Sequence, residues 1–427
     1  MIAAISHFDE GEVVYMDAAI YARRVAYFLL TTFIVVLGSA VAVRELLLSP
    51  WDALYVLPVA FIATALGANT GFHMYFTHRS FKTNAVARGG LALLGTLLCQ
   101  DGLIQWVANH KRHHRHVDVA DRDPHSPRQF GADPWRVLTV GLWWASMGWK
   151  FSRILTDKRF YAGQMLDDAL LSWFDRRFVL ISYAGFVVPF GLGWAIGGED
   201  LAVKWFAYFG AFRVFVGYFF TEFVVNGLCH CVGSSKFVTK GNSTNLVLMS
   251  PLTMGATLHH NHHAFPRVLS PAFDGEPDPM RVVYRWLERW GLLVMNPDPS
   301  FVEIEAKRMQ RPLSGEPSLA HLTTSNFTVV FATQGARFGG HRVRQRVEGV
   351  GLLSIRGNPD RTIWCAVRPC YLVRASNPRD GAGGELVLDV WVENQSRMRN
   401  AFEMPMQSMA ERWVVDPVIG RVTRLPR

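Results

Sequence analysis

The sequence predicts a mainly α-helical integral membrane protein with four transmembrane helices, followed by a small C-terminal β-rich domain. Two observations predict this architecture. Four apolar segments of about 20 residues each precede residue 226, and short apolar runs broken by Gly, Asn and Pro fill the end of the chain. Half of the 427 residues are hydrophobic and 19% are charged, which excludes a disordered chain. The mean hydropathy of +0.12 fits a mixture of membrane spans and polar segments.

The expected spans are the apolar segments 24–43, 54–72, 178–197 and 201–225. Each approaches the roughly 20 residues that cross a hydrocarbon core of about 30 Å. Buried core helices of a soluble protein are disfavoured, because these runs are too long and too uniformly apolar. Segment 87–108 is interrupted by Gln100, Asp101 and Gln105, so we expect an interfacial or re-entrant helix there. Arg213, inside the fourth span, is expected to face protein or a cavity.

Basic residues set the orientation of these spans. The loop 73–177 contains fifteen Lys and Arg, whereas the short loops 44–53 and 198–200 contain one, Arg44. The positive-inside rule therefore places 73–177 and both termini in the cytoplasm. These basic residues then face an anionic membrane leaflet or an anionic ligand. A nucleic-acid partner therefore has no support in the membrane portion, and the formal charge of +9 leaves weak support for one only in the C-terminal part of the chain.

Nine of the fifteen histidines lie at span ends or shortly beyond them, on the expected cytoplasmic side. They are His73, His78, His110, His113, His114, His230, His259, His262 and His263. Positions i, i+3 and i+4 of a helix lie within an arc of about 100°. Each of the triplets in 110–114 and 259–263 is therefore expected to aim three imidazoles one way. Asn226 shares a face with His230 at i, i+4, whereas the pair in 73–78 is five residues apart and fits only near a helix end or bend.

These clusters indicate a metal site. Neutral imidazole is the commonest metal ligand. Nine are too many for one ion and suit two ions of a first-row metal, with iron favoured for oxygen chemistry. A single HxxHH pattern is also typical of a solvated basic stretch, but four clusters at one membrane face disfavour that interpretation. Outside the expected ligand set stand His7, His116, His260, His321 and His341, while His125 in DPHS is expected to support a ligand helix from behind.

Five stretches of sequence resemble, in order and spacing, the membrane acyl-CoA (stearoyl-CoA-type) Δ9 fatty acid desaturases. They are HMYFTHRSFK, WVANHKRHHRHVDVADRDPHS, GLWWASMGW, NGLCHCVG and LHHNHHAFP. The resemblance runs from about residue 20 to about residue 300. It implies four transmembrane helices capped by a cytoplasmic helical domain. It also implies a di-iron centre ligated by the nine histidines, with Asn226 reaching the metal through water and no catalytic residue beyond the metal centre.

The implied reaction places a cis double bond, at Δ9, in a saturated fatty acyl chain, while O2 is reduced to water. An unactivated methylene C–H bond is too strong for any side-chain acid or base, so a metal-generated oxidant is needed. The protein must hold the acyl chain and exclude water. Two electrons come from a ferredoxin or a cytochrome b5-type donor with its reductase. No haem-binding or CxxC-type motif occurs in the chain, so we expect the donor to be a separate protein.

Three departures from the family pattern concern the acyl carrier. Met74 stands where the family usually has Arg, and Ala108 and Asn109 stand where animal members have Arg-Asp that helps to hold coenzyme A. Arg176 and Arg177 do match a basic pair near the thioester carrier, although a plain positive-inside anchor explains them equally. The carrier therefore stays open between coenzyme A, a membrane lipid and acyl carrier protein.

Three residues are expected to contact the acyl chain. Glu222 and Phe223 replace the Thr-Trp pair that shapes the bend in the family's acyl tunnel, and Trp149 is the last residue of GLWWASMGW. A Glu inside a span is costly unless it is paired. We therefore expect Glu222 to face the site or to meet a cation such as Arg213, and these changes put the position of the double bond in question.

The sequence divides the chain into a membrane domain, a linker and a C-terminal domain. We assign 1–310 to the membrane domain, 311–318 (RPLSGEPS) to a linker and 319–427 to the β-rich domain. In 386–392, apolar residues alternate with Val, Asp and Trp, as in a half-buried strand. The interpretations of this domain are a donor-docking module, a lipid-surface module or a passive appendage.

Two other functions compete with desaturation. Membrane di-iron hydroxylases and alkane monooxygenases also use histidine clusters, but LHHNHHAFP and the DPHS context favour desaturation. A non-enzymatic membrane metal-binding or pH-sensing protein is the alternative from another class. Zinc without iron would identify that second class, although zinc binds histidine sites readily.

Overall fold

A computed structural model describes residues 11–299, residues 303, 304 and 307, and strands between 322 and 425. The chain divides into two compact units, Met1–Pro297 and Asp298–Arg427. The sequence-assigned linker 311–318 lies outside the described residues, as do His7, His321 and His341.

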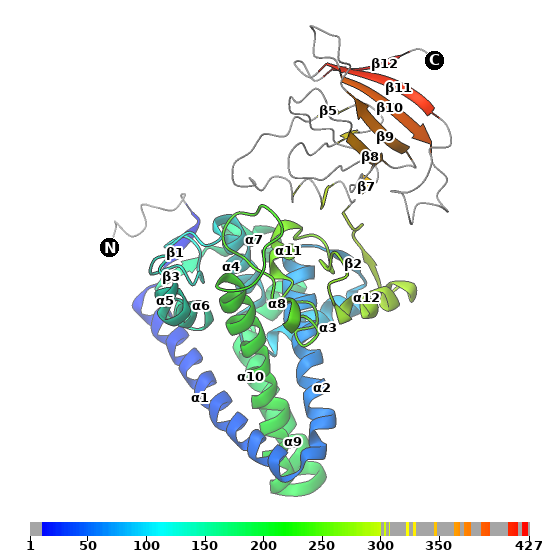
Figure 1. Cartoon of the computed structure of the whole chain (residues 1–427). Coiled ribbons are helices and arrows are strands. Elements are labelled where there is room, and N and C mark those ends of the chain that lie inside the picture. Colours follow the sequence, from blue (N-terminus) through cyan, green and yellow to red (C-terminus); the bar gives the residue numbers. More distant parts are fainter. Residues whose placement is uncertain are drawn as a thin grey trace. The chain divides into compact units, whose positions relative to one another are not determined.

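Three helices of the first unit are long and apolar enough to cross a membrane: Ala18–Leu48, Pro50–Thr77 and Phe178–His230 (Figure 1). The first, α1, begins at Asp17, whose carboxylate accepts the backbone N–H of Ile20 at 2.8 Å. The second consists of η2 Pro50–Asp52, α2 Ala53–Ala63 and η3 Thr64–Thr77. The third consists of α9 Phe178–Trp205, η6 Phe206–Phe212, α10 Arg213–Tyr218, η7 Phe219–Gly227 and η8 Leu228–His230.

The third helix folds back on itself at Gly197 and Gly198. Gly198 adopts φ 74° and ψ −160°, a backbone conformation that is almost restricted to glycine. Its two arms then run antiparallel: the rings of Phe186 and Phe206 lie 6.0 Å apart, and the guanidinium of Arg213 donates across to the carbonyl of Gly185. The two arms correspond to the apolar segments 178–197 and 201–225.

The interrupted apolar segment 87–108 forms two helices rather than one. These are α3 Ala85–Thr96 and α4 Leu103–His116. With 12 residues, α3 is only about 18 Å long, too short to cross a hydrocarbon core. It packs against η3 so closely that a Cβ on Gly67 would lie 2.7 Å from the backbone of Leu94.

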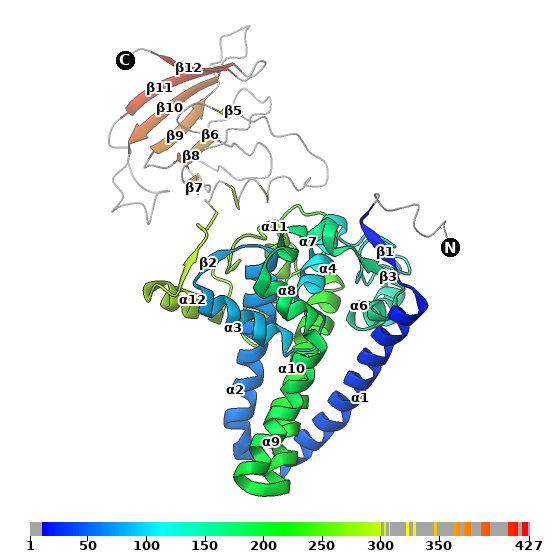
Figure 2. The same cartoon turned by 180° about the vertical axis from the view of Figure 1, so that it is seen from behind.

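Short elements gather at one end of the long helices (Figure 2). The helices among them are α5 Pro134–Arg136, η4 Val137–Gly141, α6 Leu142–Ser146, η5 Gly148–Phe151, α7 Lys158–Leu166, α8 Ala169–Arg176, η9 Val247–Met249, α11 His259–Ala264 and α12 Pro279–Arg289. Strand β1 Val13–Tyr15 pairs antiparallel with β3 Ile154–Thr156, and β2 Phe81–Thr83 pairs antiparallel with β4 Leu293–Met295. Helix α12 is joined to η3 by a 2.7 Å hydrogen bond between the hydroxyls of Tyr284 and Thr70.

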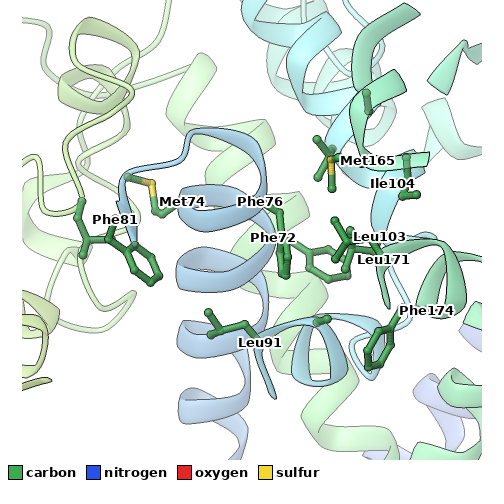
Figure 3. Close-up of a cluster of buried hydrophobic side chains, with 14 of the residues drawn as sticks. Phe72, Met74, Phe76, Phe81, Leu91, Leu103, Ile104, Met165, Leu171 and Phe174 are labelled. Atoms are coloured by element: carbon green, nitrogen blue, oxygen red, sulfur yellow. The ribbon is translucent and has the colours of Figure 1, made fainter. Parts of the chain in front are cut away.

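A buried apolar cluster connects η3 to this layer (Figure 3). Its labelled members are Phe72, Met74, Phe76, Phe81, Leu91, Leu103, Ile104, Met165, Leu171 and Phe174. Each such side chain contributes about 1.5–3 kcal/mol when fully buried. The cluster holds the end of η3 against the start of α4 and so fixes the two segments that carry the first histidines.

The second unit contains a six-stranded sheet in the order β12-β11-β10-β9-β8-β7. Its strands are β7 Arg346–Val347, β8 Ile363–Val367, β9 Tyr371–Ser376, β10 Leu386–Val392, β11 Met409–Asp416 and β12 Arg421–Leu425. All neighbours pair antiparallel except β7 and β8, which are parallel. Strands β5 Leu322–Thr323 and β6 Thr328–Val329 form a separate antiparallel pair.

Candidate metal centre

The nine histidines converge into two groups. The five-histidine group contains His73, His78, His110, His114 and His262, and the four-histidine group contains His113, His230, His259 and His263. Within each group the ligand nitrogens all lie within 4.8 Å of one another. The histidines come from η3, α4, η8 and α11, so the two groups join four segments that are far apart in the sequence.

The spacing predicted that each histidine triplet would aim its three imidazoles one way, and this prediction is wrong. On α4, His110 and His114 join the five-histidine group and His113 joins the four-histidine group. On α11 the division is reversed, because His262 leaves the pair formed by His259 and His263. The physical reason is angular. A turn of 100° per residue separates i from i+4 by about 40°, whereas i+3 lies about 60° away on the other side.

The pair His73 and His78 meets through an unusual helix end. Segment η3 is a π-helix with i→i+5 hydrogen bonds, and the backbone N–H of His78 donates to the carbonyl of His73 at 3.2 Å. The wider turn brings two residues five apart onto one side, with ring centroids 5.0 Å apart. This agrees with the expectation of a helix end or bend.

Polar contacts fix both histidine helices. The carboxylate of Asp175 accepts the backbone N–H groups of Ile104 and Gln105, which satisfies the first turn of α4. Asn261, fully buried on α11, hydrogen-bonds Asn245 and the carbonyl of Pro271. The ligand helices are therefore held from outside the two groups.

The spacing of the ring nitrogens fits a bound transition-metal ion in each group. In the five-histidine group the Nε2 atoms of His262 and His73 are 2.9 Å apart, those of His262 and His114 are 3.1 Å apart, and those of His114 and His110 are 3.0 Å apart. The corresponding distances in the four-histidine group are 2.9, 3.0 and 3.3 Å. Two imidazoles at right angles on an ion at about 2.1 Å lie about 3.0 Å from each other.

Protonation and burial agree with metal binding. Burial lowers the pKa of His78 and of all six histidines of α4 and α11 in the two groups well below the ordinary value. They are therefore neutral, which is the form that ligates metals. The Nε2 atom of His78 is buried and has no hydrogen-bond partner among the described residues. An unsatisfied buried nitrogen is costly, and a metal ion would satisfy it.

Two aspartates that the sequence analysis missed contact histidines of the four-histidine group from behind. Asp118 accepts Nδ1–H of His230 at 3.1 Å, and Asp123 lies 2.8 Å from Nδ1 of His113. Burial opposes the charge of Asp118, but His230 and several hydrogen bonds outweigh it and lower the pKa of Asp118 to about 2. For Asp123, burial and the negative charge of Asp118 raise the pKa to about 7. Both contacts turn Nε2 toward the groups. The available signal was DVADRDPHS, in which Asp123 begins DPHS and Asp118 lies five residues before it.

The remaining described histidines lie outside the two groups. His125 stacks on His113 with ring centroids 4.4 Å apart, and its backbone N–H donates to Asp123. It therefore lies directly behind a member of the four-histidine group. His116 hydrogen-bonds Glu12 at 3.0 Å, and His260 hydrogen-bonds the backbone of Phe237.

Asn226 lines a small cavity beside the five-histidine group. The cavity has a volume of about 40 Å³, and its lining includes His73, His110, Gln100 and Trp106. This volume is large enough for one or a few waters. The side-chain nitrogen of Asn226 donates to Glu222 at 2.9 Å.

Glu222 is paired, but not with Arg213. Its carboxylate lies 2.8 Å from the ammonium of Lys150, and both side chains are buried. Arg213 instead donates to the backbone carbonyls of Leu97 and Phe209, so it faces protein as expected. Glu222 and Arg213 lie on different sides of the same helix, and Lys150 on η5 is the cation that reaches Glu222.

A larger cavity of about 360 Å³ lies between α1, α6 and η7. Its lining is Thr31, Thr32, Val35, Val36, Ser146, Met147, Phe215, Tyr218, Phe219, Glu222 and Phe223. Glu222 and Phe223 thus share one cavity. Trp149 is buried outside it, with its ring 5.5 Å from that of His125.

Arg176 ends α8, Arg177 lies between α8 and α9, and both are exposed and line neither cavity. The guanidinium of Arg177 lies 4.9 Å from the ring of Trp173. This position fits an anchor at the end of an apolar helix.

Comparisons with known proteins agree with this site. Residues 52–273 match the fatty acid desaturase family. The chain is 30% identical to a hex-5-enoyl-acyl-carrier-protein acetylenase of Moorena producens, over 66% of this chain and 89% of that protein. It is 32% identical to an sn-1 stearoyl-lipid 9-desaturase of Anabaena variabilis, over 50% of this chain and 72% of that protein. It is 30% identical to the Delta-9 desaturase-like 3 protein of Arabidopsis thaliana, over 50% of this chain and 66% of that protein.

Proposed function

The chain belongs to the fatty acid desaturase family, and we propose that it introduces a cis double bond, at Δ9, into a saturated fatty acyl chain. The oxidant is O2, and two electrons come from a separate ferredoxin or cytochrome b5-type donor. The observation that carries the proposal is the convergence of nine buried or half-buried histidines into two groups with metal-like nitrogen spacing. We assign the activity to residues 1–310, with 311–318 as a linker and 319–427 as an accessory domain.

The five-histidine group would hold one iron and the four-histidine group the other. Two irons bound there supply, with O2, the oxidising power that removal of hydrogen from an unactivated methylene requires. Asp118 and Asp123 keep the ring nitrogens of His230 and His113 directed at the metal. Asn226 lines the small cavity beside His73 and would hold a water there.

The acyl chain is proposed to belong to a membrane lipid. Ala108 and Asn109 stand where animal members of the family have the Arg-Asp pair that helps to hold coenzyme A, and both residues are buried. The larger cavity is almost entirely apolar and lies between the apolar helices α1 and η7. Its wall, which includes Phe219 and Phe223, suits a hydrocarbon chain. Coenzyme A held by Arg176 and Arg177 is the competing carrier.

The proposed topology has four spans, which are α1, the helix Pro50–Thr77 and the two arms of the third helix. The active site and both termini then lie in the cytoplasm. The antiparallel arms and the fifteen basic residues of 73–177 support this arrangement.

The decisive experiment is expression in a host that lacks its own desaturase. Products are analysed by gas chromatography with double-bond localisation and by mass spectrometry, and a His262→Ala variant is the control. Loss of two hydrogens from an acyl chain, dependent on His262 and on about two irons per chain, is expected. Gain of one oxygen would identify a hydroxylase, and zinc without iron-dependent activity would identify a metal-binding protein.

A further inference from the structure

A buried ion pair lies between the two cavities. Lys150, on η5, is fully buried, and its ammonium lies 2.8 Å from one carboxylate oxygen of Glu222 on η7. The same ammonium donates to the backbone carbonyl of Gln100 at 3.1 Å and lies 4.3 Å from the centre of the Trp149 ring. Burying two charges costs several kcal/mol per ion before their attraction is counted. A hydrophobic pair would fill this space without that cost.

The second carboxylate oxygen of Glu222 determines how Asn226 is oriented. It accepts the side-chain N–H of Asn226 at 2.9 Å. A carboxylate in an ion pair only accepts hydrogen bonds, so the amide nitrogen of Asn226 must be the atom that faces Glu222. The amide oxygen is therefore the atom left for the small cavity that Asn226 shares with His73 and His110. In that cavity, Asn226 presents an acceptor.

Lys150 also reaches the five-histidine group from a second direction. The residue whose carbonyl it binds, Gln100, accepts Nε1–H of Trp106 at 3.0 Å. The Trp106 ring stacks on His110, with centroids 5.1 Å apart and planes 16° apart. One ammonium thus connects to both walls of the small cavity.

We propose that Lys150 and Glu222 are positioning residues that fix the Asn226 amide with its oxygen toward the small cavity, where it accepts a hydrogen bond from a metal-bound water. This rests on the proposed function, which supplies the metal. Lys150 holds the carboxylate of Glu222 in place through the ion pair, and Glu222 holds the amide nitrogen of Asn226. A neutral side chain without an acceptor at position 222 leaves the amide free to rotate, and the water then loses a fixed partner.

The test compares two double variants that both remove the buried charges. K150M with E222Q keeps a side-chain oxygen that can accept from Asn226, whereas K150M with E222L has similar size and no acceptor. Replacing a buried ion pair by neutral side chains is often neutral for stability, so both variants are expected to fold. The measurements are iron content, the Mössbauer spectrum of the iron-loaded protein and turnover.

We expect the E222Q double variant to resemble wild type. The E222L double variant should bind the same amount of iron, show the spectrum of an N226A variant and lose about 10- to 100-fold in turnover, the usual effect of removing a partner behind a metal site. Adding N226A should then change the E222L double variant by less than twofold, because its effect acts through Asn226. K204M is the control, since the Lys204–Asp52 pair lies at the far end of the same hairpin.

Two results would overturn the proposal. If the two double variants share one spectrum and one turnover at equal iron content, Glu222 does not act through Asn226, and the proposed function stands without this inference. If the wild-type protein binds no iron, the proposed function and the positioning role both fail. If the E222L double variant does not fold, K150M with E222M takes its place, because Met is also neutral, is similar in size and offers only a weak sulfur acceptor; the same result is expected for it.

Discussion

At the residue scale, the spacing within each histidine triplet determines which group a histidine joins: positions i and i+4 share one group, and position i+3 joins the other. His110 and His114 act together and His113 acts with the other group, and α11 repeats this division with the assignments exchanged. The sequence analysis identified all nine residues that converge, because clustering at span ends is visible in one dimension. It could not assign them to groups, because that depends on how α4 and α11 face each other. Asp118 and Asp123 were missed for the same reason.

Replacing one member of the five-histidine group should remove iron, whereas replacing a neighbouring histidine should not. In His114→Ala the Nε2 atom that lies 3.0–3.1 Å from those of His110 and His262 is lost. Iron measured by mass spectrometry should fall from about two per chain to one or fewer, and activity should disappear. His116→Ala, two residues along α4, removes only the contact to Glu12 and should keep its iron. Equal iron in both variants would refute the ligand assignment.

Asp118→Asn should weaken metal binding without unfolding the site. Asp118 accepts from Nδ1–H of His230 and from the backbone N–H of Asn242 through the same oxygen. An amide oxygen there would accept both hydrogen bonds but would lack the negative charge that strengthens the bond to His230. Metal affinity is expected to fall about 10- to 100-fold, measured by chelator competition. Asp121→Asn is a matched control, because both aspartates have positive φ, which Asn tolerates, and Asp121 is exposed and bonds Gln129. An equal effect of both substitutions would contradict a supporting role.

At the element scale, length and hydropathy predicted the long helices but not their internal form. The π-helical segments η3 and η7 carry His73 and Asn226 and have no marker in the sequence. Tertiary packing can override the local helix preference: η3 contributes Phe72 and its neighbours to a buried apolar cluster that holds the segment in place. The Lys150–Glu222 pair was also missed, because η5 and η7 are separated by about 70 residues.

The turn of the third helix gives a stability prediction. Gly198→Ala places a Cβ on a backbone conformation that is almost restricted to glycine, so it should destabilise the protein by about 1–3 kcal/mol. Gly191→Ala, on the same helix with helical backbone, should be neutral or slightly stabilising. Neither added Cβ meets an atom within 4 Å, so the comparison isolates the backbone term. Thermal unfolding in detergent measures it, and equal melting temperatures would show that the turn is not constrained.

At the scale of the whole molecule, both histidine groups and both cavities belong to the unit Met1–Pro297. The sequence indicated this, since the desaturase resemblance ends near residue 300. Sequence could not assign a role to the rest, because its strands carry no motif whose chemistry is readable.

A chain that ends at residue 310 is therefore expected to keep its iron and to desaturate acyl chains when it receives electrons from a chemical reductant. Iron analysis and product chromatography of the truncated and full-length proteins check this. Loss of activity with the protein donor alone would make the accessory domain a donor-docking module, and loss of membrane association would make it a lipid-surface module. Loss of iron would show that the two units are interdependent.

Because α4 and α11 each contribute to both histidine groups, they connect the two proposed metal positions. An ion bound in one group would order α4 and α11, which the other group also needs. The second ion would then bind without again losing the conformational entropy of these two helices. Filling of the two positions is then cooperative, and by reciprocity the loss of either ion loosens the other. A titration with iron should pass from empty to doubly loaded chains with few singly loaded ones between.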